Sequence, residues 1–412
     1  MRRSVVAVVA ALFVVAFAHR DAVAQRLLCE QYPGCTSYPS DSLGGSVDGG
    51  LSDPNTDPMA NLGGDAGNAP QFAVNEQFGS FGGDQFVSTD ASMIGDLIGP
   101  RIIFQGRTVV SPSATSRFKL SDNQSPIPRN RVFYNYSHFS NAVDDTNMGS
   151  GNSNFDIDRH VFGLEKTFFD GMSSFEIRVP FANTTGAQQN VTAGTPFTSA
   201  TEFGDIAMAI KVLLMNRGNF QMSAGIAGSL PSGADLVLND PNLGQTVLKN
   251  DAVHAGPFMG FIYRPTQRWV LQSVLQVDFV LNGNDFYDES TGVTGQFQDQ
   301  NLFMAAISSA YWLRQNDRSA LISDIAGIVE LHYTTSTARG DMISNPSYPD
   351  SRYMSLVATQ DATVNVFNIT AGTELRFGPR NSVIIGAGAP LVNGAADRLF
   401  DTEFLVQYNR FY

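Results

Sequence analysis

The chain has 412 residues, of which 43% are hydrophobic and only 16% are charged, and its formal net charge at pH 7 is −13. Soluble globular domains carry about 25% charged residues, so this composition favours a protein that alternates lipid-facing and water-facing side chains. The acidic balance argues against nucleic acid as a partner.

The first 24 residues predict a secretory signal peptide. Arg2 and Arg3 precede the uncharged apolar run 5–18, and Ala24 ends a small-residue cleavage site, with cleavage after Ala18 as the alternative. No later stretch reaches the roughly 18 consecutive apolar residues of a spanning helix. Any membrane insertion must therefore use β-strands.

Residues 25–98 predict a mostly disordered tail, because Gly, Asp, Asn, Ser and Pro dominate and too little apolar surface is available for burial. Cys29 and Cys35 predict a small local disulfide in an oxidising compartment, with free thiols as the alternative. Residues 99–128 predict a linker, a partial plug of the lumen, or a periplasmic cap.

The sequence pattern of residues 129–412 predicts that this region forms the barrel. Apolar and polar residues alternate over 175–181, 206–214, 269–279 and 367–377. Short connections alternate with long polar loops, as in outer-membrane barrels with tight periplasmic turns and longer outer loops. We therefore expect an all-β fold, a transmembrane antiparallel β-barrel of about 12 strands, with about 14 as the alternative. A soluble β-sandwich or propeller competes less well, because its strands are shorter.

The C-terminal residues alternate up to the aromatic Tyr412. Phe404, Val406 and Tyr408 point one way, and Glu403 and Gln407 point the other. A barrel must end on a strand, because lipid tolerates no open sheet edge. We expect this strand to meet one that begins near residue 132, to be bound by the outer-membrane assembly machinery, and to lie in the bacterial outer membrane.

Two regions carry a family resemblance. The segment 204–206, its hairpin and 230–233 (Leu-Pro-Ser-Gly) resemble the outer-membrane family of aromatic-degradation operons, which is related to the long-chain fatty-acid transporters. The segments 125–136 and 162–171 resemble exported proteins of planctomycete-type bacteria. The first resemblance implies a barrel that conducts small, partly hydrophobic solutes. The Asn-Pro-Ala hatch motif of the transporters is replaced here by Asn68-Ala69-Pro70.

Charged residues on the polar face of the predicted strands are candidates for the lining of the pore. We expect them to act either as a filter of mixed sign or as a scaffold of paired charges. They are Glu165, Glu176, Arg178, Asp205, Lys211, Asp278, Asp324, Glu330, His332, Glu374 and Arg376. Glu330 and His332 lie two residues apart and share one face.

The sequence predicts a channel or uptake barrel for passive passage of small solutes, hydrophobic ones included. The alternative is a structural or adhesive barrel with a filled lumen. We expect no enzyme, metal site or cofactor, because His160, His254 and His332 lack a nucleophile motif, and Asp53-x-Asn55-x-Asp57 lacks the later ligands of a calcium loop. The oligomeric state stays open.

Overall fold

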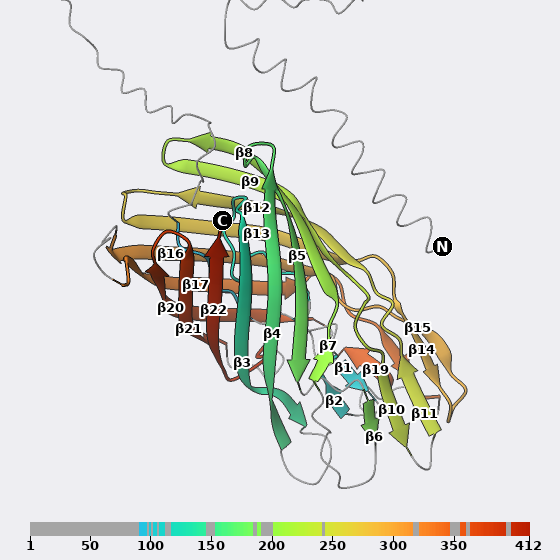
Figure 1. Ribbon diagram of the computed structural model, residues 1–412. Coiled ribbons are helices and arrows are strands. Elements are labelled where there is room, and N and C mark those ends of the chain that lie inside the picture. Colours follow the sequence, from blue (N-terminus) through green and yellow to red (C-terminus); the bar gives the residue numbers. More distant parts are fainter. Residues whose placement is uncertain are drawn as a thin grey trace, which may run out of the picture. The chain divides into compact units, whose positions relative to one another are not determined.

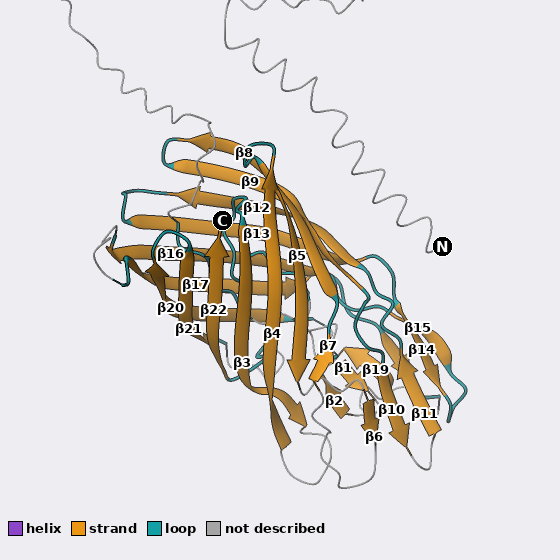
Figure 2. Cartoon of the chain, in the orientation of Figure 1, coloured by secondary structure: helices purple, strands orange, loops and turns teal. Residues whose placement is uncertain are grey.

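The computed structural model describes residues 90–96, 99, 102–104, 107–111, 117–145, 153–183, 188–190, 201–240, 244–315, 321–346, 355–359, 363–392 and 397–412 (Figure 1). The predicted signal peptide, the tail up to residue 89 and the predicted Cys29–Cys35 disulfide lie outside these residues. The regular elements are β-strands (Figure 2). Within the described ranges, no helix is long and apolar enough to cross a membrane.

Twelve of the described strands close an antiparallel barrel. They are β3 (Arg131–Asp145), β4 (Ser153–Phe168), β5 (Ser173–Asn183), β8 (Ile206–Arg217), β9 (Phe220–Leu230), β12 (His254–Tyr263), β13 (Trp269–Val280), β16 (Leu302–Arg314), β17 (Asp324–Ser336), β20 (Asn365–Phe377), β21 (Asn381–Pro390) and β22 (Thr402–Phe411). The barrel closes where β22 pairs with β3, from Thr402↔Ser140 to Phe411↔Arg131. The prediction of about twelve strands, with the last meeting the first, is confirmed.

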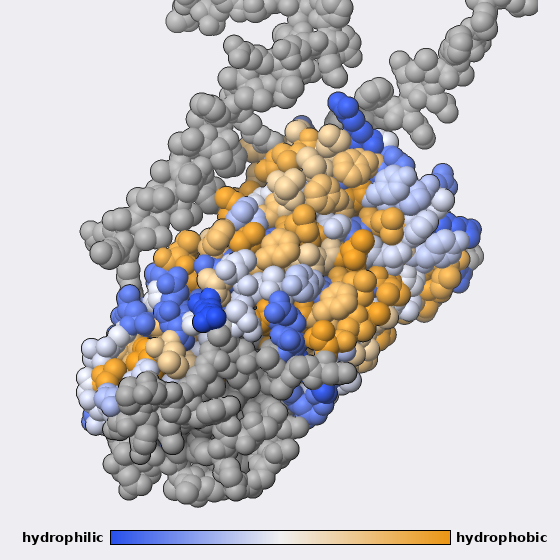
Figure 3. Space-filling model, turned by 180° about the vertical axis from the view of Figure 1, so that it is seen from behind, coloured by the Kyte–Doolittle hydropathy of each residue, from blue (hydrophilic) through white to orange (hydrophobic). Residues whose placement is uncertain are grey.

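Burial alternates along each strand with the period of two that a barrel wall requires. The outward positions are apolar and exposed: Phe162 is 52%, Ile226 58% and Ile307 53% exposed. The inward positions include fully buried polar groups such as Glu176 and Ser308. On the face seen in Figure 3, apolar side chains gather over the barrel. This apolar-out, polar-in arrangement suits lipid outside and a polar lumen inside.

The barrel has two unlike ends. The short-turn end carries the brief connections around residues 170, 218, 266 and 379, together with the start of β3 and the C-terminus. The long-loop end carries ten further strands. They are β1 (Ile102–Phe104), β2 (Arg107–Val109), β6 (Gln188–Asn190), β7 (Thr201–Phe203), β10 (Leu236–Asp240), β11 (Gly244–Leu248), β14 (Asn284–Asp288), β15 (Thr294–Phe297), β18 (Met342–Ser344) and β19 (Ser355–Thr359).

Nine of these ten strands form two small sheets, and β7 pairs with β5 of the barrel instead. Seven of the nine lie where the sequence predicted polar loops, and β1 and β2 lie within the predicted linker, plug or cap of residues 99–128. One sheet has the order β15-β14-β11-β10-β6, and the other has the order β18-β19-β1-β2. Their apolar side chains, including Leu238, Phe286, Phe297 and Val357, pack into one buried cluster. Sequence alternation did not predict these strands, because each spans only three to five residues.

Two segments that precede β3 pass through the lumen. The ascending segment, residues 90–96, starts at the short-turn end, and β1 then pairs with β19 at the long-loop end. The descending segment, residues 117–130, returns to the start of β3. Residues 90–96 were predicted as part of the flexible tail, and that boundary is wrong. They are buried, because their apolar side chains pack inside the wall and wall carboxylates accept their backbone N–H groups.

Candidate functional site: the filled lumen

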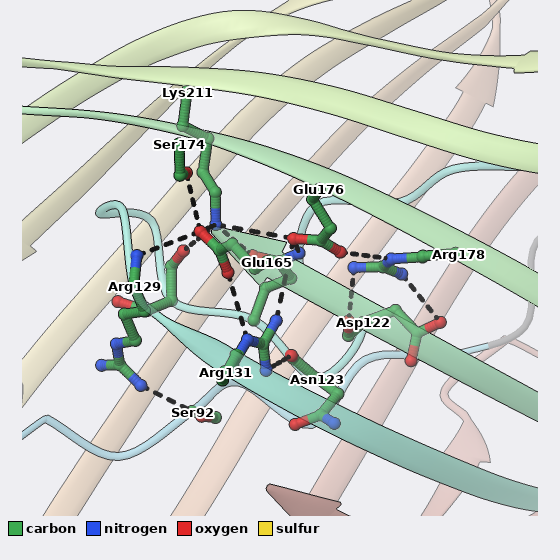
Figure 4. A network of polar contacts seen from close by, with 12 residues as sticks. Ser92, Asp122, Asn123, Arg129, Arg131, Glu165, Ser174, Glu176, Arg178 and Lys211 are labelled. Atoms are coloured by element: carbon green, nitrogen blue, oxygen red, sulfur yellow. Dashed lines mark hydrogen bonds and ion pairs between the residues drawn. The ribbon is translucent and has the colours of Figure 1, made fainter. Parts of the chain in front are cut away.

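A cluster of buried charges lies on the inner faces of β3, β4, β5 and β8 (Figure 4). Lys211 Nζ lies 2.6 Å from Glu165 Oε1 and 3.7 Å from Glu176 Oε2. Arg178 Nε donates to Glu176 Oε1 at 2.6 Å, and Arg131 Nε donates to Glu165 Oε2 at 3.1 Å. All five side chains are at most 3% exposed. Four of the predicted lumen-facing residues therefore meet here, and Arg131 joins them although the sequence had not singled it out.

The descending segment completes this cluster of charges. Gln124 donates through Nε2 to Glu176, and its Oε1 accepts a hydrogen bond from Lys211 Nζ at 2.5 Å. Arg178 Nη2 donates to the carbonyl oxygen of Asp122 at 2.9 Å. A buried charge is stable only when it is paired and hydrogen-bonded. Withdrawal of the descending segment would therefore leave wall charges with fewer partners.

The ascending segment is held by Glu330, on the inner face of β17. The Glu330 carboxylate accepts the N–H of Ile94 at 2.9 Å and that of Gly95 at 3.1 Å. Gly95 has a φ of +93°, and a Cβ there would lie 2.5 Å from Asp122 Cα on the descending segment. Only glycine both adopts this positive φ readily and leaves room for the close contact with Asp122. The consecutive N–H groups form an anion-binding nest that encloses a carboxylate of the wall.

Asp96 connects the ascending segment to the descending segment and to the wall. It forms an ion pair with Lys119 of the descending segment and accepts from Asn368 Nδ2 at 2.9 Å. His332 Nδ1 lies 3.6 Å from Asp96 Oδ1, and His332 Nε2 lies 3.0 Å from Glu330 Oε2. The imidazole therefore stands between a carboxylate of the wall and a carboxylate of the segment. Glu330 and His332 both lie buried on the inner face of β17.

The start of the ascending segment is fixed at the short-turn end. The carboxylate of Asp90 pairs with Arg264, and its carbonyl oxygen accepts from Arg376 Nη2 at 2.8 Å. Arg376 Nε also donates to Glu374 Oε1 at 2.9 Å, while Glu374 Oε2 accepts the N–H of Ser92 at 3.0 Å. Glu374 and Arg376 thus act as one unit on β20 that binds the backbone of the segment.

Three of the predicted residues, Asp278, Asp324 and Asp205, lie away from these clusters. Asp278 lies 3.6 Å from Arg117 and 3.3 Å from His254 near the long-loop end. Asp324 is half-buried at the start of β17 and accepts from Ser323 Oγ at 2.6 Å.

Asp205 precedes β8 and orders the turn that follows β9. Its Oδ1 accepts the N–H groups of Ser232 at 3.0 Å and Gly233 at 2.9 Å. Burial raises the pKa of Asp205 above its ordinary value, although these bonds and one from Asn250 oppose the rise. Asp205 therefore shapes a loop at the long-loop end. The Leu-Pro-Ser-Gly stretch that carried the family resemblance contains its two backbone partners.

Apolar side chains, four of them alanines, line a different part of the lumen, which we call the alanine sector. They belong to β8, β9, β12, β13 and β16 and face Met93, Phe118 and Leu120 of the two segments. The wall residues are Ala207, Ala209, Ala227, Phe258, Val274 and Ala306. Each is at most 5% exposed. The predicted pore-lining residues are charged or titratable and do not include this sector, although alanines alternate along β8 in the sequence.

The alanine sector contacts the segments through neutral groups. Gln276 donates through Nε2 to the carbonyl oxygen of Phe118 at 2.6 Å and accepts the N–H of Leu120 at 2.9 Å. Ser223 Oγ donates to the carbonyl oxygen of Pro126. Across the part of the chain that the structure describes, no group of three or more His, Cys, Asp or Glu side chains is arranged to hold a metal ion.

The closed antiparallel barrel, its exposed apolar outer face and its polar lumen define a transmembrane β-barrel of the bacterial outer membrane. A family model described as "Putative MetA-pathway of phenol degradation" matches residues 135–322. No curated protein matches the chain.

Several solved barrel structures are similar to the chain. An outer membrane channel from Pseudomonas putida F1 matches with 12% identity over 69% of this chain and 97% of that chain, at a TM-score of 0.47. The NanC porin matches with 10% identity over 69% and 99%, at a TM-score of 0.39. The Pseudomonas putida toluene transporter TodX matches with 8% identity over 78% and 99%, at a TM-score of 0.34.

Proposed function

We propose that this protein is an outer-membrane channel for the passive passage of small apolar solutes. One observation carries the proposal: separate clusters of buried apolar side chains lie inside the barrel at its two ends and in its middle. Phe139 and Phe400 belong to the cluster at the long-loop end, the alanine sector lies in the middle, and Ile262 and Val270 belong to the cluster at the short-turn end.

The charged groups of the lumen support an apolar solute over a polar one. Glu165, Glu176, Lys211, Glu330 and Glu374 are fully or almost fully buried and bind each other or the two segments. They fit the predicted scaffold of paired charges better than the predicted filter, because a filter needs groups that are free to bind solutes. An apolar solute needs no such group and only has to displace apolar side chains.

The family model that matches residues 135–322 also supports small apolar compounds as the solutes. Its description concerns the degradation of phenol, a small aromatic compound. The printed name of one similar structure, the toluene transporter TodX, concerns another small aromatic compound. For this chain the solute remains a proposal, which rests on the apolar clusters of its own lumen.

The second candidate function is a structural barrel without transport. It is favoured by the buried ion pair Asp96–Lys119 and the partly buried pair Asp90–Arg264, which anchor the two segments to each other and to the wall. In that case the lumen is a folded core, and no solute crosses it. The two functions differ in whether an apolar compound enters cells faster when the protein is present.

Influx of N-phenyl-1-naphthylamine tests the proposal, because this apolar amine becomes fluorescent once it passes the outer membrane. Gram-negative cells that produce the protein should show faster influx than cells with an empty vector. Entry of a zwitterionic β-lactam, measured by its hydrolysis in the periplasm, should be the same in both. An unchanged rate for the apolar probe, with folded protein present in the outer membrane, would support the structural barrel instead.

A further inference from the structure

We propose that the solute path runs along the alanine sector, with Phe258 of β12 as its gate and flat aromatic molecules as its preferred solutes. The path lies between the wall strands β8, β9, β12, β13 and β16 and the side chains of Met93, Phe118 and Leu120. This inference rests on the proposed channel function and specifies its route and selectivity.

The two segments meet the wall through charged groups on one side and through apolar side chains at the alanine sector. The free-energy cost of opening a path is lower on the apolar side. Along β3–β5 and β17–β20, movement of a segment would break buried ion pairs and hydrogen bonds, such as those of Glu330 with Ile94 and Gly95. Breaking a buried pair leaves an uncompensated charge, which is strongly unfavourable. Along the alanine sector, an apolar solute replaces one apolar contact with another, so most of the burial free energy is retained.

The backbone of the descending segment can stay in place while the path opens. Gln276 binds the carbonyl oxygen of Phe118 and the N–H of Leu120, so both halves of its side-chain amide are occupied. The apolar side chains of Phe118 and Leu120 make no hydrogen bonds. The Phe118 ring lies 4.2 Å from the Arg178 guanidinium on its far side, so the rings and methyl groups that move on opening are those that face the alanine sector. Met93 opposite them is unbranched and adapts easily to a changed neighbour.

The width of the path is set by alanine methyl groups and by one aromatic ring. Ala207, Ala209, Ala227 and Ala306 leave the wall thin. The Phe258 ring covers Gly225 so closely that a Cβ at Gly225 would lie 2.4 Å from Phe258 Cζ. Rotation of that ring opens a slot about as thick as the ring itself, which suits a flat aromatic solute.

The uncharged wall continues toward both ends of the barrel along β16. Leu302 and Met304 lie on the inner face beyond Ala306 at the long-loop end. Ser308 and Ala310 follow toward the short-turn end, where Ala310 joins the next apolar cluster. All five side chains are at most 5% exposed. An apolar solute therefore meets no charged side chain on the inner face of β16 over this distance.

Two matched Phe→Ala substitutions test the route. Phe258→Ala should raise N-phenyl-1-naphthylamine influx several-fold, because it removes the gate. Phe133→Ala removes an equally buried ring from the inner face of β3, where it lies 4.3 Å from the Arg131 guanidinium, and should leave influx unchanged. Ala227→Leu should lower influx by narrowing the slot. Heat-modifiable migration on a denaturing gel reports whether each variant has folded.

Each outcome of this comparison has one meaning. If the wild type gives faster influx than the vector but Phe258→Ala gives the same rate as the wild type, the proposed route is wrong. The channel function then still holds. An equal rise in Phe133→Ala would overturn the route as well. If Phe258→Ala does not fold, an unchanged rate in Ala227→Leu would overturn the route. Influx at the vector level in the wild type and in every variant would defeat the channel function itself.

Discussion

Glu330 binds the ascending segment through backbone groups, so its effect depends on the carboxylate itself and on no side chain of the segment. The N–H groups of Ile94 and Gly95 converge on it, and His332 Nε2 lies 3.0 Å from the same carboxylate. Hydrogen bonds to a charged acceptor are about twice as strong as neutral ones. The position of Ile94 and Gly95 in the lumen should therefore depend on this charge, while Glu374 binds the start of the segment.

Glu330→Gln should loosen the ascending segment without changing the barrel. Loss of a hydrogen bond to a charged group costs about 1.5–3 kcal/mol, which corresponds to roughly ten- to hundredfold faster amide exchange. Hydrogen exchange of a peptide that contains Ile94 and Gly95 measures the change. Asp324→Asn is the control, because Asp324 lies on the same strand β17 and accepts a hydrogen bond from Ser323 of the wall at 2.6 Å. Equal acceleration in both variants would contradict the assigned role.

Lys211 neutralises two buried carboxylates and should be the most sensitive cation of the wall. Lys211→Met leaves Glu165 and Glu176 with less compensation, and breaking a buried pair costs about 3–5 kcal/mol. The urea midpoint of barrel unfolding in lipid should fall accordingly, and the added change Glu165→Gln should restore part of it. Lys166→Met, at an exposed outward position of β4, should have almost no effect. A midpoint shift as small as that of Lys166→Met would show that Lys211 is not needed.

At the scale of elements, the four-stranded sheet ties the chain that joins the ascending and descending segments to a long loop. β1 pairs with β19, so the chain between the ascending and descending segments supplies a strand to a loop sheet. In the five-stranded sheet, Asp288 at the end of β14 binds the turn before β15. Its carboxylate accepts from Ser290 Oγ at 2.7 Å and from Thr291 N at 2.9 Å.

The hairpin of β14 and β15 should lose stability in acid. Burial opposes ionisation of Asp288, but hydrogen bonds from Thr246, Thr291 and Ser290 outweigh it and lower its pKa below 3.8. The fold thus favours the ionised form, so its stabilising effect is complete above the ordinary pKa and is lost as the pH falls through the lowered value. Pepsin cleavage within residues 284–297 should accelerate over this range. Asp288→Asn should remove that pH dependence, and an unchanged profile would contradict the assignment.

At the scale of the whole molecule, the barrel could be predicted from the sequence and the filling of its lumen could not. Long strands such as β17 and β20 span 13 residues each with a period of two, and short and long connections alternate between the barrel strands, so the approximate strand count could be predicted. The ascending segment is bound through the N–H groups of Ser92, Ile94 and Gly95, which leave no side-chain pattern in the sequence.

For the charged residues of the lumen, too, the direction of the side chains could be predicted from the sequence and their interaction partners could not. Alternation predicted an inward direction for Glu165, Glu176, Arg178 and Lys211, and their side chains meet in the buried cluster (Figure 4). Their partners were not predictable, because Gln124 reaches Lys211 over 87 positions of sequence and no local pattern relates the two. The ion pair of Asp96 with Lys119 likewise depends on the return of the chain through the lumen.

Single-channel recording in planar bilayers tests the central claim most directly, namely that residues 90–96 and 117–130 close the lumen to ions. The wild-type protein should give no stepwise ion conductance, whereas a variant that lacks residues 90–128 should give clear steps. If that deletion does not fold, Glu330→Gln combined with Glu374→Gln should give intermittent steps, because both carboxylates that bind the ascending segment lose their charge. Steps of equal size in the wild type and the deletion variant would contradict the account.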